Sequence, residues 1–223
     1  MKPSHIIFGG IGTLVETSEY QYQAYNTALM LNDIDYYWER KDYVASLSFS
    51  GGPLRLEKIL MANGSRLTSE QIVNVHSDKT RVFNTLIRER GLKLREGADE
   101  LIAFCLNRGV KLAWATTTRQ DNIDAITDSL DNDLLVQSLV KITNSTFVEN
   151  PKPNSEIYQK MMIYLDITEK DAIAIEDSPS GVKSSSDAGI TTLAFPGEMN
   201  SGKDFSAAHM IISDLSEVVS YIE

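Results

Sequence analysis

The sequence predicts an α/β protein, with a three-layer core built on a parallel sheet and a small α-helical domain inserted into that core. Short apolar runs at residues 6–8, 110–115, 172–175 and 190–195, each followed by a turn and a helical pattern, predict strands covered by helices on both faces. A weaker run at residues 210–212 precedes a short closing helix that begins near Asp214. Residues 9–109 contain amphipathic helix patterns and no convincing strand, so this segment is too long for a simple crossover between strands.

The clearest helix of the insert has a predicted start, an apolar face and a predicted end. Thr68 and Gln71 form a candidate capping box, and Gly91 is a candidate stop. The apolar face consists of Ile72, Val75, Val82, Phe83, Leu86 and Ile87. With the helical segments 18–33 and 54–63, this helix predicts a helical cap domain over residues 18–90. The α/β core then comprises residues 1–17 and 91–223, joined to the cap by short hinges at residues 15–18 and 91–96.

Composition excludes several classes of partner. A formal net charge of -10 and a pI near 4.8 disfavour binding to nucleic acid or to an anionic membrane surface. Cys105 is the only cysteine, which excludes an internal disulfide and is typical of a reducing compartment. No apolar run approaches the roughly 20 residues that cross a bilayer, so we expect a cytoplasmic protein.

Polar residues follow the predicted strands, at the edge of the sheet where functional groups gather in parallel α/β proteins. Thr116 and Thr117 end the second strand before a helix, and their hydroxyls with the helix N-terminus favour an anion. A threonine that only caps the helix is the commoner interpretation of this pattern taken alone. Lys152 lies between two prolines that fix its backbone, although a solvated surface lysine is again the commoner case. Glu176 and Asp177 end a buried strand, where adjacent carboxylates need a cation or hydrogen bonds.

Taken together, these residues resemble a known family. Thr116, Lys152 and the pair Glu176 and Asp177 match, in order and context, the second, third and fourth signature motifs of the haloacid dehalogenase superfamily. The chain is most similar to its β-phosphoglucomutase-like group, and in particular to the CbbY-type sugar-phosphate phosphatases. That finer match is carried by Tyr36-Tyr37-Trp38, Ser50-Gly51-Gly52-Pro53-Leu54-Arg55, Ala115-Thr116-Thr117-Thr118 with Asn122, and Asp204-Phe205. The resemblance covers essentially the whole chain and implies a Rossmann-like core with a helical cap.

The resemblance also assigns roles to positions of this chain. Active members carry two aspartates in the first motif, a nucleophile and an acid/base, and these positions are Gly9 and Ile11 here. Glycine offers no nucleophile and isoleucine exchanges no proton, so covalent and acid/base catalysis are both lost.

The other motifs keep the residue types that the family uses for binding. The resemblance implies that Thr116, Thr117 and Lys152 hold a phosphoryl group, and that Asp177, supported by Glu176, holds magnesium, weakened here by the change at Gly9. Arg55 of the cap would face the sugar or its second phosphate, although Pro53 stands where a nearby lysine is expected.

The prediction is therefore a phosphatase-like protein that retains a pocket for a phosphorylated small molecule, a sugar phosphate, and lacks phosphoryl transfer. Two alternatives stay open. One is an active magnesium-dependent phosphatase that uses an unrecognised nucleophile, and the other is an interaction or scaffold protein with a protein partner.

Overall fold

The computed structural model describes residues 2–48, 51–64, 66–130 and 133–222, which form two compact units. The first comprises Met1–Glu16 and Leu92–Glu223, and the second comprises Thr17–Gly91. Ser50, part of a segment that carries the family resemblance, lies outside the described residues. None of the helices in the described ranges has the length and apolar character needed to span a membrane.

The first unit is built on a parallel sheet with the strand order β3-β2-β1-β4-β5-β6. The strands are β1 (His5–Phe8), β2 (Lys111–Trp114), β3 (Leu139–Ile142), β4 (Ala172–Glu176), β5 (Thr191–Ala194) and β6 (Met210–Ile211). The predicted α/β class and all the predicted strands are confirmed. Strand β3 was not predicted, because it lies at the edge of the sheet, is only partly buried and contains Lys141.

Helices connect these strands and close the unit after β6. They are α1 (Ile11–Leu14), α6 (Ala98–Arg108), α7 (Gln120–Ser129), α8 (Asp133–Ser138), α9 (Glu156–Leu165), α10 (Pro179–Asp187) and α11 (Val219–Ile222). A 3₁₀ turn over Leu215–Val218 leads into α11, and Asp214 is its N-cap, in agreement with the predicted start of the closing helix.

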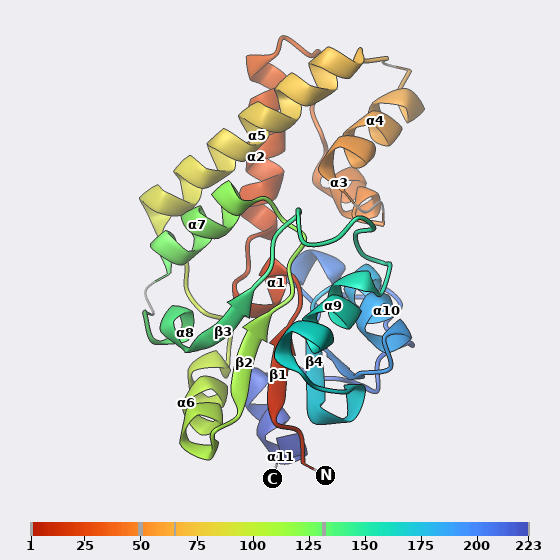
Figure 1. Cartoon of the computed structure of the whole chain (residues 1–223). Coiled ribbons are helices and arrows are strands. Elements are labelled where there is room, and N and C mark those ends of the chain that lie inside the picture. Colours follow the sequence, from red (N-terminus) through yellow and green to blue (C-terminus); the bar gives the residue numbers. More distant parts are fainter. Residues whose placement is uncertain (1, 49–50, 65, 131–132, 223) are drawn as a thin grey trace. The chain divides into compact units, whose positions relative to one another are not determined.

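Strand β1 is the point where the strand order reverses, since its neighbours are β2 on one side and β4 on the other (Figure 1). Phe8, the last residue of β1, is paired with Trp114 of β2 and with Ile175 of β4. The loops that follow these strands therefore leave the sheet side by side. In parallel sheets of this kind, ligands bind at such a switch point.

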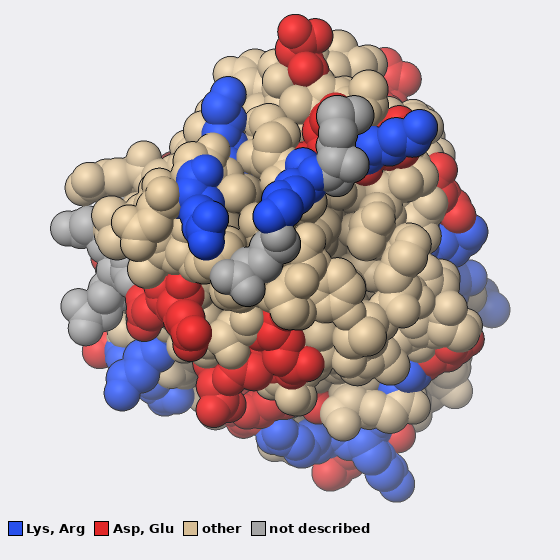
Figure 2. All heavy atoms as spheres, turned by 90° about the horizontal axis from the view of Figure 1, so that it is seen from below, with Lys and Arg blue, Asp and Glu red and all other residues tan. Residues whose placement is uncertain are grey.

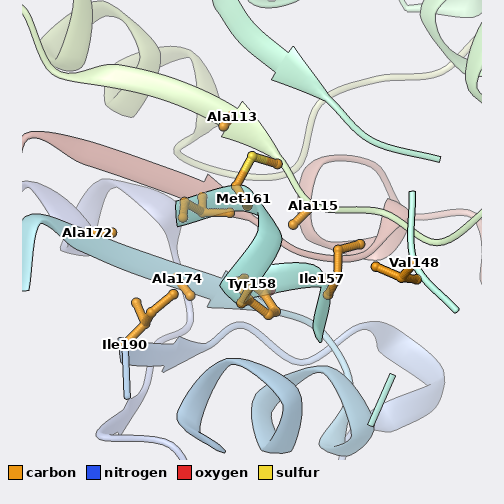
Figure 3. Close-up of a cluster of buried hydrophobic side chains, with 10 residues drawn as sticks. Ala113, Ala115, Val148, Ile157, Tyr158, Met161, Ala172, Ala174 and Ile190 are labelled. Atoms are coloured by element: carbon orange, nitrogen blue, oxygen red, sulfur yellow. The ribbon is translucent and has the colours of Figure 1, made fainter. Parts of the chain in front are cut away.

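Helix α9 packs directly on one face of the sheet. Figure 3 shows Ile157, Tyr158 and Met161 of α9 against the small residues Ala113, Ala172 and Ala174 of the strands and Ala115 directly after β2. The alanines allow the helix to approach closely, and Tyr158 is fully buried there. The alternate strand residues, Ile6, Phe8, Leu112 and Trp114, are buried as well, as expected for a parallel sheet covered on both faces.

The second unit consists of α2 (Ser18–Leu31), α3 (Arg40–Ser46), α4 (Gly52–Ala62) and α5 (Ser69–Arg90), and no strand occurs among its described residues. Helices α2 and α5 pack against each other. The predicted capping box of Thr68 and Gln71 is present, and Gly91 ends the helix with a positive φ of 71°. Tyr25, Trp38 and Tyr43 form an aromatic cluster with ring centroids 5.1 to 6.0 Å apart.

Charged side chains of both signs are exposed on the face of the molecule that Figure 2 draws. On the face shown in Figure 2, Lys and Arg lie among Asp and Glu, and the described residues on that face form no broad basic surface of the kind that binds nucleic acid phosphates.

Candidate functional site

The loop that follows β1 is the structural centre of the site. Gly9 continues the sheet, since its N–H donates to the carbonyl of Ile175 at 2.8 Å, and Gly10 is the N-cap of α1. Thr13, one turn later, is fully buried and directs its hydroxyl to the carboxylate of Asp177 at 3.3 Å and the carbonyl of Ile175 at 3.4 Å. This loop is therefore held against the end of β4.

Glu176, the last residue of β4, turns its carboxylate into the space beside that loop. Its side chain is 0% exposed and accepts hydrogen bonds from Lys152 Nζ at 2.6 Å and from the Tyr158 hydroxyl at 2.5 Å, both on Oε1. The N–H of Gly10 donates to Oε2 at 3.3 Å. The negative charge is thus balanced by a lysine and satisfied by three donors, which is what makes its burial tolerable.

Glycines make room for the two acidic side chains. A Cβ atom at Gly9 would lie 2.0 Å from Cδ of Glu176, and one at Gly181 would lie 2.0 Å from its Oε2. Cβ atoms at Gly10 and Gly12 would each lie 2.3 Å from a carboxylate oxygen of Asp177. The Glu176 carboxylate consequently lies in space that any side chain at Gly9 would enter.

Asp177 is half-buried and differs from Glu176 in its electrostatic environment. Burial, followed by the negative charge of Glu176, raises the pKa of Asp177 to about 6. The same two causes, burial first and Glu176 second, raise the pKa of Tyr158, so its hydroxyl stays protonated and remains a donor.

Thr116 and Thr117 follow β2 at the predicted position. Thr116 is buried, and its hydroxyl oxygen accepts from the N–H of Thr118 at 3.2 Å. Its hydroxyl hydrogen has no acceptor within the described part of the chain, and the half-buried Thr117 side chain makes no hydrogen bond there. Helix α7 begins four residues after Thr116, at Gln120, so its N-terminus follows the same loop. The loop therefore offers donors suited to an anion.

Lys152 is buried and not the solvated surface lysine of the commoner interpretation. Besides Glu176, its ammonium donates to the carbonyl of Ala115 at 2.8 Å, directly before Thr116. It lies 5.1 Å from the centroid of the Tyr158 ring. The structure therefore brings together the sequence-predicted residues of the core unit, at the ends of β1, β2 and β4.

Two contributors to this site were missed in the sequence. Tyr158 was not predicted as a site residue, and its hydroxyl donates to the carboxylate of Glu176. Arg95 donates from Nη1 to the carbonyls of Gly12 at 2.7 Å and Phe195 at 2.9 Å, and from Nη2 to the carbonyl of Pro196 at 2.8 Å. It also lies 3.4 Å from the centroid of the Phe195 ring. Arg95 thus ties the β1 loop to the loop after β5.

Arg55 belongs to the second unit, where it lies in α4. It interacts with the hydroxyls of Tyr25 and Tyr43. A second cation, Lys79 of α5, is only 7% exposed, and its Nζ lies 5.2 Å from the centroids of the Tyr25 and Phe83 rings. Burial, with a smaller contribution from the Arg55 charge, lowers the pKa of Lys79 to about 7.

A signal for Lys79 was present in the sequence. It falls midway between Val75 and Phe83, at the four-residue spacing of the apolar face of α5, where a lysine is out of place.

The residues implied for magnesium do not form a ready metal site. The described residues contain no group of three or more His, Cys, Asp or Glu arranged to hold a metal ion. Oε1 of Glu176 faces the ammonium of Lys152, which would repel a cation placed there. Asp177 alone is a weak donor set for magnesium, so the arrangement does not fit a resident ion.

The comparisons with known proteins identify the family of this chain. The sequence profile of a family described as haloacid dehalogenase-like hydrolase matches residues 6–195. Protein CbbY of Rhodobacter capsulatus is 32% identical over 216 residues, which cover 97% of this chain and 95% of that protein. Protein CbbY of Cereibacter sphaeroides is 29% identical over 213 residues, which cover 96% of this chain and 93% of that protein.

Solved structures give the same result. The crystal structure of CbbY from Rhodobacter sphaeroides in complex with phosphate is similar with a TM-score of 0.87 and 28% identity, over 98% of this chain and 96% of that one. A variant of that protein in complex with xylulose-(1,5)bisphosphate gives a TM-score of 0.89 and 27% identity, over 100% of both chains. The chain therefore belongs to the haloacid dehalogenase-like hydrolase family, in its CbbY and phosphoglucomutase-like branch.

Proposed function

We propose that this protein binds a phosphorylated sugar and does not transfer its phosphoryl group. One observation carries the proposal: the loop after β1 has no carboxylate at Gly9 or Ile11, while Thr116 and Lys152 lie at the ends of the neighbouring strands. The donors for a phosphate are kept, and the groups for its chemistry are absent.

The related structures support the choice of ligand. The Rhodobacter sphaeroides protein was crystallised with phosphate and, as a variant, with xylulose-(1,5)bisphosphate. By similarity, the ligand proposed here is a sugar phosphate or bisphosphate. Thr116, Thr117 and Lys152 would hold one phosphate.

The second unit contributes positive charge of its own. Arg55 and Lys79 lie near the same ring, that of Tyr25. We assign Arg55 to an anionic or hydroxyl group of the sugar ligand.

Nearby groups are poor substitutes for the missing nucleophile. The Glu176 carboxylate is paired with Lys152, and the Thr13 hydroxyl is directed to Asp177, so neither group is poised to attack a phosphorus atom in this arrangement. Deleting the nucleophile of a covalent enzyme costs on the order of 10⁶ in turnover, which is effectively complete loss. Magnesium is expected to bind weakly through Asp177, and only when phosphate oxygens complete its coordination.

Titration calorimetry tests this proposal. Xylulose 1,5-bisphosphate and inorganic phosphate should release or absorb heat on binding, and unphosphorylated xylulose should not. The variant Thr116→Val should bind phosphate about tenfold more weakly, because a hydroxyl donor to an anion is lost. Thr127→Val is the matched control, since among the described residues the Thr127 hydroxyl bonds only to backbone carbonyls of α7, those of Ile123 and Asp124.

Two results would overturn the proposal. One is the absence of binding by any phosphorylated compound, with or without magnesium. The other is release of phosphate from the bisphosphate by the natural protein at a rate typical of enzymes, about 1 s⁻¹ or faster.

A further inference from the structure

The Glu176 carboxylate lies where a side chain at position 9 would be. A Cβ atom on Gly9 would meet Cδ of Glu176 at 2.0 Å and both of its carboxylate oxygens at 2.3 Å. Gly181, at the start of α10, leaves a matching space on the other side, where a Cβ atom would lie 2.0 Å from Oε2. Glu176 is therefore enclosed between two residues that have no side chain.

The carboxylate also uses the donors that the proposed phosphate would need. Lys152 contacts it at 2.6 Å, and the N–H of Gly10 at the start of α1 donates to it at 3.3 Å. Tyr158, on the buried face of α9, adds a hydroxyl donor 2.5 Å from the carboxylate. A backbone amide, a lysine and a hydroxyl that all donate to one carboxylate form an anion-binding site. The anion in this site is the carboxylate of Glu176, a residue of the chain itself.

This occupant competes with an external anion. Two of the ammonium hydrogens of Lys152 are directed to the carbonyl of Ala115 and the carboxylate of Glu176. A phosphate that binds to Lys152 therefore has to displace the Glu176 carboxylate or lie close to its negative charge. Like charges at such short range in a buried site repel strongly. The Glu176 carboxylate lies at the end of a flexible side chain, so its displacement requires a change of side-chain rotamer and no change of the backbone.

We propose that the Glu176 carboxylate is a resident anion that closes the phosphate site, and that a phosphorylated ligand binds by displacing it from Lys152. This inference rests on the proposed phosphate-binding function and adds its regulation. Loss of the side chain at position 9 then has two effects: it removes the family's nucleophile and makes room for the competing carboxylate.

Phosphate affinity in two variants tests the proposal. Glu176→Gln keeps the shape of the side chain and removes its charge. Gly9→Ala keeps every charge, but its methyl group would overlap the Glu176 carboxylate and force it out. Inorganic phosphate, titrated by calorimetry, should bind both variants at least about tenfold more tightly than the natural protein.

The matched control is Asp187→Asn. It makes the same change in net charge at the exposed end of α10, where Asp187 pairs with Lys183, and it should leave phosphate affinity unchanged. A melting curve for each variant establishes that it is folded before titration.

The remaining outcomes separate this inference from the proposed function. If the natural protein binds phosphate and Gly9→Ala binds it no more tightly, the resident-anion proposal is wrong, even if Glu176→Gln binds more tightly, because charge removal alone explains that. If Gly9→Ala binds more tightly and Glu176→Gln does not, Lys152 is not the shared partner and the proposal is equally wrong. If no folded variant binds phosphate at all, the proposed function itself fails.

Discussion

The substitution Lys79→Met should stabilise the protein at pH 6, and the gain should shrink as the pH rises. Lys79 is buried against Tyr25 and Phe83, and burial lowers its pKa from 10.5 to about 7. A fall of that size in the pKa means that burying the charged lysine lowers the free energy of unfolding by about 5 kcal/mol. Methionine has a similar shape and no charge, so it removes this penalty while losing about 1 to 2 kcal/mol of attraction to the two rings. The expected net gain at pH 6 is about 3 kcal/mol.

The sign of the pH dependence follows from the lowered pKa. Below pH 7 both the folded and the unfolded chain carry the charge, so the full penalty is present. Between pH 7 and 10.5 the folded chain has released the proton and the unfolded chain still holds it, so the stability contributed by Lys79 rises with pH. The natural protein should therefore approach the stability of the variant as the pH increases toward 9.5, within this window.

Urea unfolding at pH 6 and pH 9.5 measures this difference. Tryptophan fluorescence reports on both units, since Trp38 lies in the second and Trp114 in the first, both buried. Lys58→Met, at an exposed position of α4, is the control and should change stability little at either pH. A stability difference between the natural protein and Lys79→Met that is the same at both pH values would refute the argument from burial.

Two further substitutions test interactions that stabilise each unit by itself, Arg95 in the first unit and the helix cap at Thr68 in the second. Arg95→Ala should lower the free energy of unfolding in urea by about 3 kcal/mol, because three hydrogen bonds to carbonyls and the stacking on Phe195 are lost. Arg95→Lys should recover less than half of that loss. A loss below about 1 kcal/mol in Arg95→Ala would contradict the role given to Arg95. Thr68→Ala should cost about 1 kcal/mol by removing the capping box of α5, and an unchanged thermal midpoint would count against that cap.

Much of the fold could be predicted from the sequence, because buried parallel strands appear as short continuous apolar runs. The predicted runs at residues 6–8, 110–115 and 172–175 proved to contain neighbouring strands, so the motifs after them meet. Strand β3 could not be found in this way. Its position at the sheet edge leaves Val140 exposed and admits Lys141, so its sequence lacks the apolar signal.

The site was only partly predictable, for a different reason. Thr116, Lys152 and Glu176 could be predicted from motif positions, since each lies at or near the end of a regular element. The contacts of Tyr158 and Arg95 join segments far apart in the chain, and no local pattern reports them. At Gly9 the sequence showed only that a carboxylate is missing, whereas the structure shows that the Glu176 carboxylate lies in the same space.

The direct test of the account is a comparison of the natural protein with the double variant Gly9→Asp, Ile11→Asp in a phosphate-release assay with magnesium. The new aspartate at position 9 would displace the Glu176 carboxylate, and the pair would supply the nucleophile and the proton carrier that the family uses. We expect the natural protein to bind xylulose 1,5-bisphosphate without releasing phosphate, and the double variant to release it. Equal turnover by the two proteins would contradict the claim that this chain keeps the phosphate site and has lost phosphoryl transfer.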